Sequence, residues 1–191
     1  MLARRARIAV TAAIAAALAA IVLVFLPWAF GETRSSHCRD DPTAFPLVGV
    51  AGWQGEQLEN AATIMRAGAA LGLGHEAQVL GVMTAMGESS LRNLDYGDWE
   101  TIGFTNPDGS RTTSLGLFQQ QEWWGSVEQR MDPTSAATLF YVRLAALDGW
   151  QQMAPSRAIH SIQINTDPDY YARFHDDATT VVNALSGPCP T

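Results

Sequence analysis

Gly87-Glu88-Ser89-Ser90-Leu91 follows directly on an apolar run and places one acid at the end of it. The run, Val79 to Met86, is apolar on nearly every face, which is typical of a helix that passes through a core. Together with the further helices predicted below, this run indicates a mainly α-helical domain, with Glu88 at the C-terminal end of its buried helix.

Glu88 is the candidate catalytic residue. Partial burial and the negative end of the helix dipole both favour the protonated form of a carboxyl group in this position. A protonated carboxyl group can act as a general acid near neutral pH, which a glutamate with the ordinary pKa of about 4.3 does poorly. The structural alternative is an ion pair between Glu88 and Arg92, one turn further on.

A second segment, Ser114-Leu115-Gly116-Leu117-Phe118-Gln119-Gln120, begins 26 residues after Glu88. Gly116 allows a close backbone approach, and Gln119 offers both a donor and an acceptor. With Glu88-Ser89, the segment resembles the pattern of the lysozyme-like superfamily, in the lytic transglycosylase branch and its compact actinobacterial, membrane-anchored form. That pattern is a catalytic Glu followed by Ser, a loop and then S-x-G-L-M-Q, with Phe118 here where Met is commoner. The resemblance covers residues 55–185.

The resemblance implies a fold, an activity and a set of site residues. The fold is a lysozyme-like domain of about five helices with room for a small β-hairpin or loop lobe. The activity is cleavage of the β-1,4 bond between N-acetylmuramic acid and N-acetylglucosamine in peptidoglycan, as a lytic transglycosylase or a muramidase. Glu88 acts as acid and base, and no cofactor or metal is implied. The substrate-binding residues expected from this segment are Ser114, Gly116, Gln119 and Gln120.

Whether the site uses a second catalytic carboxylate is left open by the sequence. Hydrolytic lysozymes use one as a nucleophile or as a base for water, and Asp98 or Asp95 are the candidates in the loop after Glu88. Transglycosylases need none, because the muramyl 6-hydroxyl attacks within the same sugar and a single Glu serves as acid and then base.

Aromatic side chains near the second segment are candidates for sugar stacking, because sugar rings present apolar C–H faces. We select two of these side chains, Trp124 of the pair Trp123-Trp124 and Tyr170. The alternative is that both belong to the core or its rim.

The N-terminus predicts export. Residues 1–7 form a basic tail, and residues 8–30 are an uncharged apolar stretch of roughly 35 Å as a helix, long enough to cross a bilayer with the arginines in the cytosol. The alternative is a signal segment that is cleaved, which would leave a secreted protein. In both cases residues 31–52 are a linker and residues 53–191 an extracytoplasmic domain.

The two cysteines, Cys38 and Cys189, lie near the two ends of this domain. Outside the cytoplasm, we expect them to form a disulfide that closes a loop of about 150 residues and contributes roughly 5 kcal/mol in the chain-entropy model. Such a bond would hold the two ends together.

Charge and histidine spacing restrict the partners. The formal charge is −7, and without Arg4, Arg5 and Arg7 it is −10, which argues against nucleic acid. His75-Glu76 lacks the second His of a zinc helix. The expected partners are peptidoglycan glycan strands, the membrane through residues 8–30 and an envelope or secretion complex. The alternative function is a catalytically silent lysozyme-like module that binds glycan or serves as a scaffold.

Further helices are predicted from caps and periodicity. Asp132-Pro133 is an N-cap and first-turn pair, and Gly187-Pro188 marks a helix end. Besides the helix that ends near Glu88, the expected helical ranges are 54–71, 132–147, 157–164 and 166–185.

Overall fold

The computed structural model describes residues 49–163 and 165–186. The predicted membrane segment at 8–30, most of the predicted linker and both cysteines, Cys38 and Cys189, lie outside the described residues. No helix within the described ranges is both long enough and apolar enough to span a bilayer.

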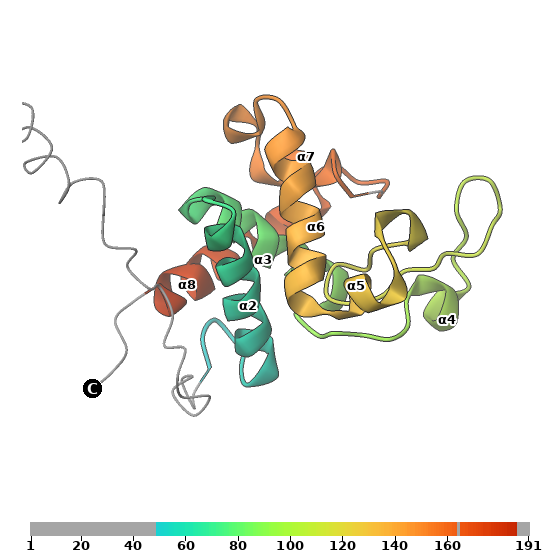
Figure 1. Cartoon of the computed structure of the whole chain (residues 1–191), viewed down its shortest axis with the longest axis horizontal. Helices are drawn as coiled ribbons and strands as arrows, with labels where there is room; N and C mark the ends of the chain where they lie inside the picture. The colour runs from blue at the N-terminus through green and yellow to red at the C-terminus, as the bar shows by residue number, and fades with distance from the viewer. Residues whose placement is uncertain (1–48, 164, 187–191) are drawn as a thin grey trace, which may run out of the picture. The chain divides into compact units, whose positions relative to one another are not determined.

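Four longer helices form the body of the domain (Figure 1). They are α2 (Glu56–Ala70), α3 (His75–Ser89), α6 (Pro133–Ala146) and α8 (His175–Leu185). The helices α2, α6 and α8 all pack against α3. The mainly α-helical class predicted from the sequence is therefore confirmed.

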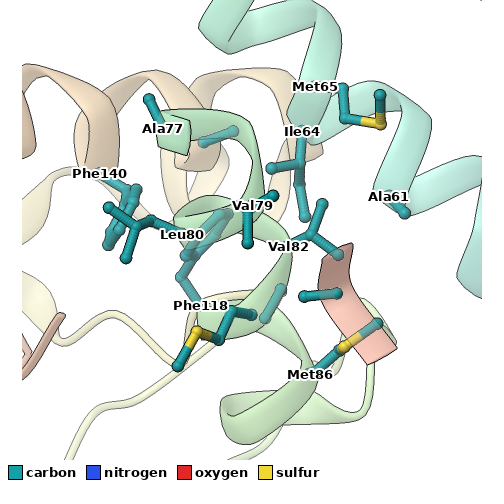
Figure 2. Close-up of a cluster of buried hydrophobic side chains, with 14 of the residues drawn as sticks. Ala61, Ile64, Met65, Ala77, Val79, Leu80, Val82, Met86, Phe118 and Phe140 are labelled. Atoms are coloured by element: carbon teal, nitrogen blue, oxygen red, sulfur yellow. The ribbon is translucent and has the colours of Figure 1, made fainter. Parts of the chain in front are cut away.

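Helix α3 is central because almost every side chain on it is buried. Figure 2 shows Val79, Leu80 and Val82 of α3 among side chains from α2, α6 and the second segment. The ring of Phe118 stacks on Phe140 of α6, with 5.2 Å between ring centroids. The second segment is thus part of the same core as the helix that carries Glu88.

Shorter elements connect these helices. They are α4 (Asp98–Ile102), η1 (Glu122–Trp124), α5 (Val127–Met131), η2 (Trp150–Gln152), α7 (Pro155–His160) and η3 (Tyr170–Phe174). We call residues 93–113 the α4 lobe. Within the described residues this lobe has an isolated bridge between Thr105 and Arg111 instead of a β-hairpin.

The predicted helices are confirmed where a cap or a long pattern marked them. The Asp132 side chain accepts a hydrogen bond from the Ser135 amide, 2.8 Å away, and so caps α6 at the predicted residue. Two predicted ranges were wrong. Helix α7 ends at His160, and the single helix expected over 166–185 is instead η3 followed by α8, because the chain turns at 170–174 to bury Tyr171.

Candidate active site

The end of α3 is a fixed turn. Ser90 and Leu91 both have left-handed backbone angles, with φ of 53° and 58°. Leu91 is fully buried, and the carbonyl groups of the two residues accept hydrogen bonds from α2, at 2.9 Å from Gln57 and 2.9 Å from Asn60. Burial and hydrogen bonding together hold a backbone that non-glycine residues rarely adopt. The backbone that follows Glu88 at the end of α3 is therefore held in one conformation.

Ser89 joins α3 to the second segment. Its hydroxyl donates to the carbonyl oxygen of Leu117 at 2.7 Å, with the Ala85 carbonyl at 3.1 Å as a further acceptor. Ser89 thus holds the second segment beside Glu88, which explains why a serine follows the glutamate in the sequence.

The second segment is a tight turn. Leu115 and Gln120 exchange backbone hydrogen bonds of 3.1 and 3.0 Å, and Gly116 turns the chain with φ of 76°. The Gly116 amide donates to the Leu94 carbonyl at 2.7 Å, and a Cβ atom there would lie 2.1 Å from the Arg130 carbonyl oxygen. Only glycine fits this position without a backbone shift.

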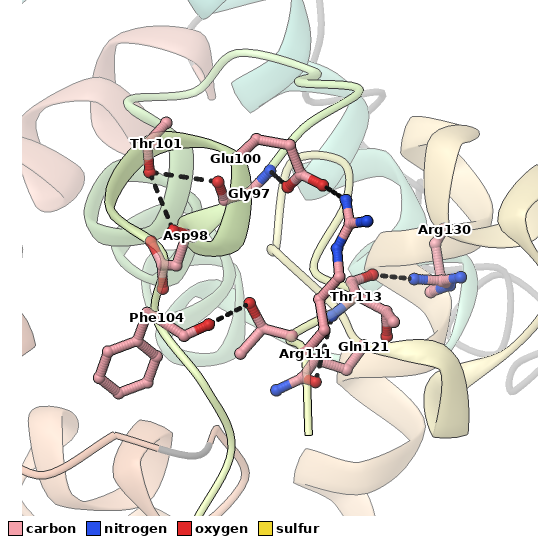
Figure 3. Close-up of polar contacts among 10 residues, drawn as sticks. Gly97, Asp98, Glu100, Thr101, Phe104, Arg111, Thr113, Gln121 and Arg130 are labelled. Carbon is pink, nitrogen blue, oxygen red and sulfur yellow. Dashed lines mark hydrogen bonds and ion pairs between the residues drawn. The ribbon is translucent and has the colours of Figure 1, made fainter. Parts of the chain in front are cut away.

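Arg130 holds both ends of this turn from α5. Its buried guanidinium donates to the carbonyl groups of Thr113 at 2.6 Å, Gln120 at 2.9 Å and Gly125 at 3.1 Å. Figure 3 shows the bond to Thr113 at the point where the α4 lobe returns to the core. Three peptide carbonyl groups thus compensate part of the cost of burying the charge.

A pocket of about 430 Å³ lies between the α4 lobe and the core. Five residues selected from the sequence line it: Glu88, Asp98, Ser114, Gln119 and Trp124. The other lining residues are Phe104, Thr105, Asn106, Pro107, Thr112, Gln121, Trp123, Gln163, Asn165 and Thr166. The structure therefore brings together one acid from the core, one from the lobe, five amide side chains and a tryptophan pair.

Glu88 has the electrostatics of a general acid. Burial raises its pKa to about 7, a hydrogen bond from the Tyr171 hydroxyl acts in the opposite direction, and the charge of Asp98 adds to the increase. Within the described ranges Glu88 has no ion-pair partner, and Arg92 is exposed. The structural alternative of a Glu88–Arg92 pair is thus absent from the observed geometry.

The remaining residues selected from the sequence lie elsewhere. Asp95 is exposed and does not line the pocket. Gly116 packs against Arg130, and the buried Gln120 donates its amide to the Ala136 carbonyl of α6 at 3.0 Å. Tyr170 does not line the pocket either, and its hydroxyl donates to the Gly87 carbonyl at 2.9 Å.

Sequence reasoning missed the part of the pocket wall that Gln163, Asn165 and Thr166 form, and it missed the contact between Tyr171 and Glu88. Tyr171, next to Tyr170, is the tyrosine that contacts Glu88, and its amide is held by the Ser156 hydroxyl of α7 at 3.1 Å. Gln163 donates to the Phe118 carbonyl at 3.0 Å and so joins the same wall to the second segment. These residues lie far from Glu88 in sequence, and the one local signal was the adjacent tyrosine pair.

In the described part of the chain, no group of three or more His, Cys, Asp or Glu side chains is arranged to hold a metal ion. Comparison with known proteins gives no matching family model and no matching curated protein.

Proposed function

We propose that this chain is a lysozyme-like, peptidoglycan-cleaving enzyme, a lytic transglycosylase or muramidase, which breaks the β-1,4 bond between N-acetylmuramic acid and N-acetylglucosamine. One observation carries the proposal. Glu88 lies in a pocket large enough for a sugar ring, and its pKa of about 7 leaves a substantial protonated fraction at neutral pH. A buried acid without an ion pair is costly unless it is used, and acid catalysis is a use that fits this pocket.

The chemistry needs one acid that changes role. Protonated Glu88 delivers its proton to the glycosidic oxygen while the bond to the anomeric carbon breaks, and the resulting carboxylate then removes a proton from the nucleophile. In the transglycosylase route the nucleophile is the muramyl 6-hydroxyl, and in the muramidase route it is water. The Tyr171 hydroxyl supports the second half, because it donates to the Glu88 carboxyl and stabilises the ionised form between the two steps.

The polar wall of the pocket fits an N-acetyl sugar. The Gln119 amide nitrogen is occupied by the carbonyl groups of Tyr96 at 3.2 Å and Gly116 at 3.1 Å, which leaves the side-chain oxygen to accept the N–H of an acetamido group. Ser114 lines the same wall, and the exposed Trp123 offers a ring face to the apolar side of a sugar. Trp124, selected from the sequence for this role, is instead buried in the core with the Arg143 guanidinium over its ring, 3.4 Å from the ring centroid.

Asp98 is the residue that distinguishes the two routes. It lines the pocket from the α4 lobe and raises the pKa of Glu88 through its charge. If the enzyme hydrolyses, Asp98 is the carboxylate that stabilises the oxocarbenium-like state or activates water. If it is a transglycosylase, the role of Asp98 is restricted to its effect on Glu88.

The proposed setting is the outer face of a cell membrane. Residues 8–30 serve as the anchor or as a cleaved signal, residues 31–52 as the linker, and Cys38 and Cys189 as a disulfide of the exported domain. The substrate is a glycan strand of the wall, reached directly or within an envelope or secretion complex. No cofactor is part of the proposal.

Digestion of purified peptidoglycan tests the proposal. The full-length chain and its Glu88→Gln variant are incubated with the wall polymer, and the released muropeptides are identified by mass spectrometry. Glu59→Gln, an exposed residue in the first turn of α2, is the matched control. We expect release by the wild type and by Glu59→Gln, and a loss of about 100-fold or more in Glu88→Gln.

The products then assign the route. Anhydromuramyl ends identify a transglycosylase, and reducing ends identify a muramidase with Asp98 as the second carboxylate. If the wild type and Glu88→Gln both bind the glycan and release nothing, the proposal fails and a silent binding or scaffolding module is the better account.

A further inference from the structure

Five amide side chains line the pocket, and each has a nitrogen that donates and an oxygen that only accepts. The Gln121 nitrogen donates to the Asn106 oxygen at 2.9 Å, and the Gln121 oxygen accepts from the Thr113 amide at 3.4 Å. The Asn165 oxygen lies 2.6 Å from the His160 Nδ1 atom, which must be the donor in this pair. The oxygens of three of the five side chains are therefore occupied by partners within the protein.

Gln163 has the opposite arrangement. It is only 7% exposed, and its amide nitrogen lies 3.0 Å from the carbonyl oxygen of Phe118 in the second segment. A carbonyl oxygen can only accept, so the nitrogen must face Phe118 and the side-chain oxygen must face away from it. Within the described residues this oxygen has no donor, and it is not one of the enclosed atoms without a partner, so it opens on the pocket that Gln163 lines.

Gln120 makes the same bond in a different place. It is 1% exposed, and its nitrogen donates to the Ala136 carbonyl, also at 3.0 Å. Its oxygen is enclosed by protein atoms without a partner, and the residue does not line the pocket. Both glutamines thus attach to the backbone in the same way, and they differ in whether the oxygen can reach a ligand.

The Gln163 oxygen has a counterpart on the second segment. Gln119 also donates from its nitrogen to backbone carbonyl groups and keeps its oxygen for the pocket. No cation is among the described residues that line the pocket, so its polar wall favours a neutral ligand with several hydrogen-bond donors over an anion. We infer that Gln163 is a further substrate-binding residue, whose oxygen accepts a hydrogen bond from an O–H or N–H group of the bound sugar. The inference rests on the proposed function, because it concerns the substrate of the same site.

Binding of a sugar without cleavage tests the assignment. The parent is the full-length chain with Glu88→Gln, and the probes are the β-1,4-linked trimers of N-acetylglucosamine and of glucose, which differ only in the acetamido group. Gln163→Met keeps the length of the side chain and removes its polar atoms, so calorimetry should show binding of the N-acetylglucosamine trimer weakened about 10-fold. An equal loss for both probes identifies a hydroxyl as the donor, and a loss confined to the acetamido probe identifies its N–H.

Gln120→Met is the matched control. It removes the same donation to a backbone carbonyl from a buried glutamine outside the pocket, and it should leave the affinity for both probes unchanged. If Gln163→Met binds the N-acetylglucosamine trimer as the parent does, the inference is overturned. It is also overturned if Gln120→Met weakens binding to the same extent, because the loss then comes from the backbone attachment and not from the oxygen in the pocket.

A second variant serves if Gln163→Met does not fold. Gln163→Glu keeps an acceptor oxygen and adds a negative charge at the same place. It should bind the trimer of glucosamine, with its amines charged, about 10-fold more tightly than the parent does, because the hydrogen bond becomes charge-assisted. An unchanged affinity for this cationic probe would mean that the side chain does not face the ligand, and the inference would fall.

Cleavage separates this inference from the proposed function. If binding depends on Gln163 while the wild type releases nothing from peptidoglycan, the binding role stands and the proposed chemistry falls. If the wild type cleaves peptidoglycan and Gln163→Met cleaves it with the same KM, the proposed function stands and the inference falls. If the parent binds neither probe, the inference falls whatever the result of the digestion.

Discussion

The helical core and the α4 lobe meet at the pocket, and they are held in place by different means. Around α3 the side chains are almost all buried, and apolar packing fixes the position of Glu88. Helix α4 has no buried residue, and Ile102 of the lobe is 75% exposed. The lobe is attached by hydrogen bonds, by Arg130 and by close backbone contacts at Gly97 and Gly116. Apolar packing thus positions Glu88, whereas hydrogen bonds and close backbone contacts position the opposite wall of the pocket.

Gly116→Ala tests this difference with the largest expected effect. The added Cβ would meet the Arg130 carbonyl oxygen at 2.1 Å in a residue with φ of 76°, so we expect a loss of about 3 kcal/mol or more in the free energy of unfolding. Gly109→Ala is the control inside the lobe, with φ of 84° and open space around it, and should cost about 1 kcal/mol. Equal losses in urea unfolding would remove the distinction between the two regions.

Glu88→Gln should change the free energy of unfolding by an intermediate amount. Unlike Gly116→Ala, it should stabilise the protein, and the size of the effect should depend on pH. The folded-state pKa of Glu88 is raised to about 7 from an ordinary value of 4.5, so its favourable contribution is complete below pH 4.5 and is lost as the pH rises through 7. Gln resembles the protonated form at every pH. We therefore expect the variant to be more stable than the wild type by about 1–3 kcal/mol at pH 8 and nearly equal to it at pH 4.

Thermal unfolding at the two pH values measures this effect, with Glu59→Gln, at an exposed position of α2, as the matched control. A variant that is less stable than the wild type at pH 8 would mean that packing does not desolvate Glu88. Apolar packing around α3 would then not be the cause of the raised pKa of Glu88.

Glu100→Gln, in the α4 lobe, should have the smallest effect. Glu100 accepts from the Gly97 amide and pairs with Arg111, and both contacts lower its pKa (Figure 3). Because the pair is exposed, we expect the melting temperature at pH 7 to stay within about 2 °C of the wild type. Any loss should be present above the ordinary glutamate pKa and disappear in acid. A large loss at pH 7 would show that the lobe depends on this ion pair.

The sequence predicted what packing dictates. Helices α2, α3 and α6 have long apolar patterns or a clear cap, and they were found within a few residues of their observed ends. Helices α4 and α5 have five residues each, too few for a periodic pattern to be recognised. The range 166–185 reads as one helix locally, and the break at η3 depends on the burial of Tyr171 in a core that lies far away in sequence.

The candidate site likewise contains residues that could be predicted from the sequence and residues that could not. Glu88, Ser114 and Gln119 could be selected because they belong to two short segments with a recognisable pattern, and they do line one pocket. Tyr171 could not, because its contact with Glu88 arises only when η3 folds back onto the end of α3. The choice of Tyr170 over Tyr171 reflects this limit, since neighbouring residues point in different directions and local sequence does not say which one reaches the acid.

The hydrogen bonds of Arg130 determine the conditions under which the site keeps its structure. It joins Thr113, Gln120 and Gly125 through one cation and three peptide dipoles, which makes it a cross-link without a covalent bond. A disulfide needs an oxidising compartment, and a lysine in its place would lose its proton at high pH. A guanidinium has neither requirement. The link between the lobe and the core should therefore be the same in oxidising and in reducing surroundings.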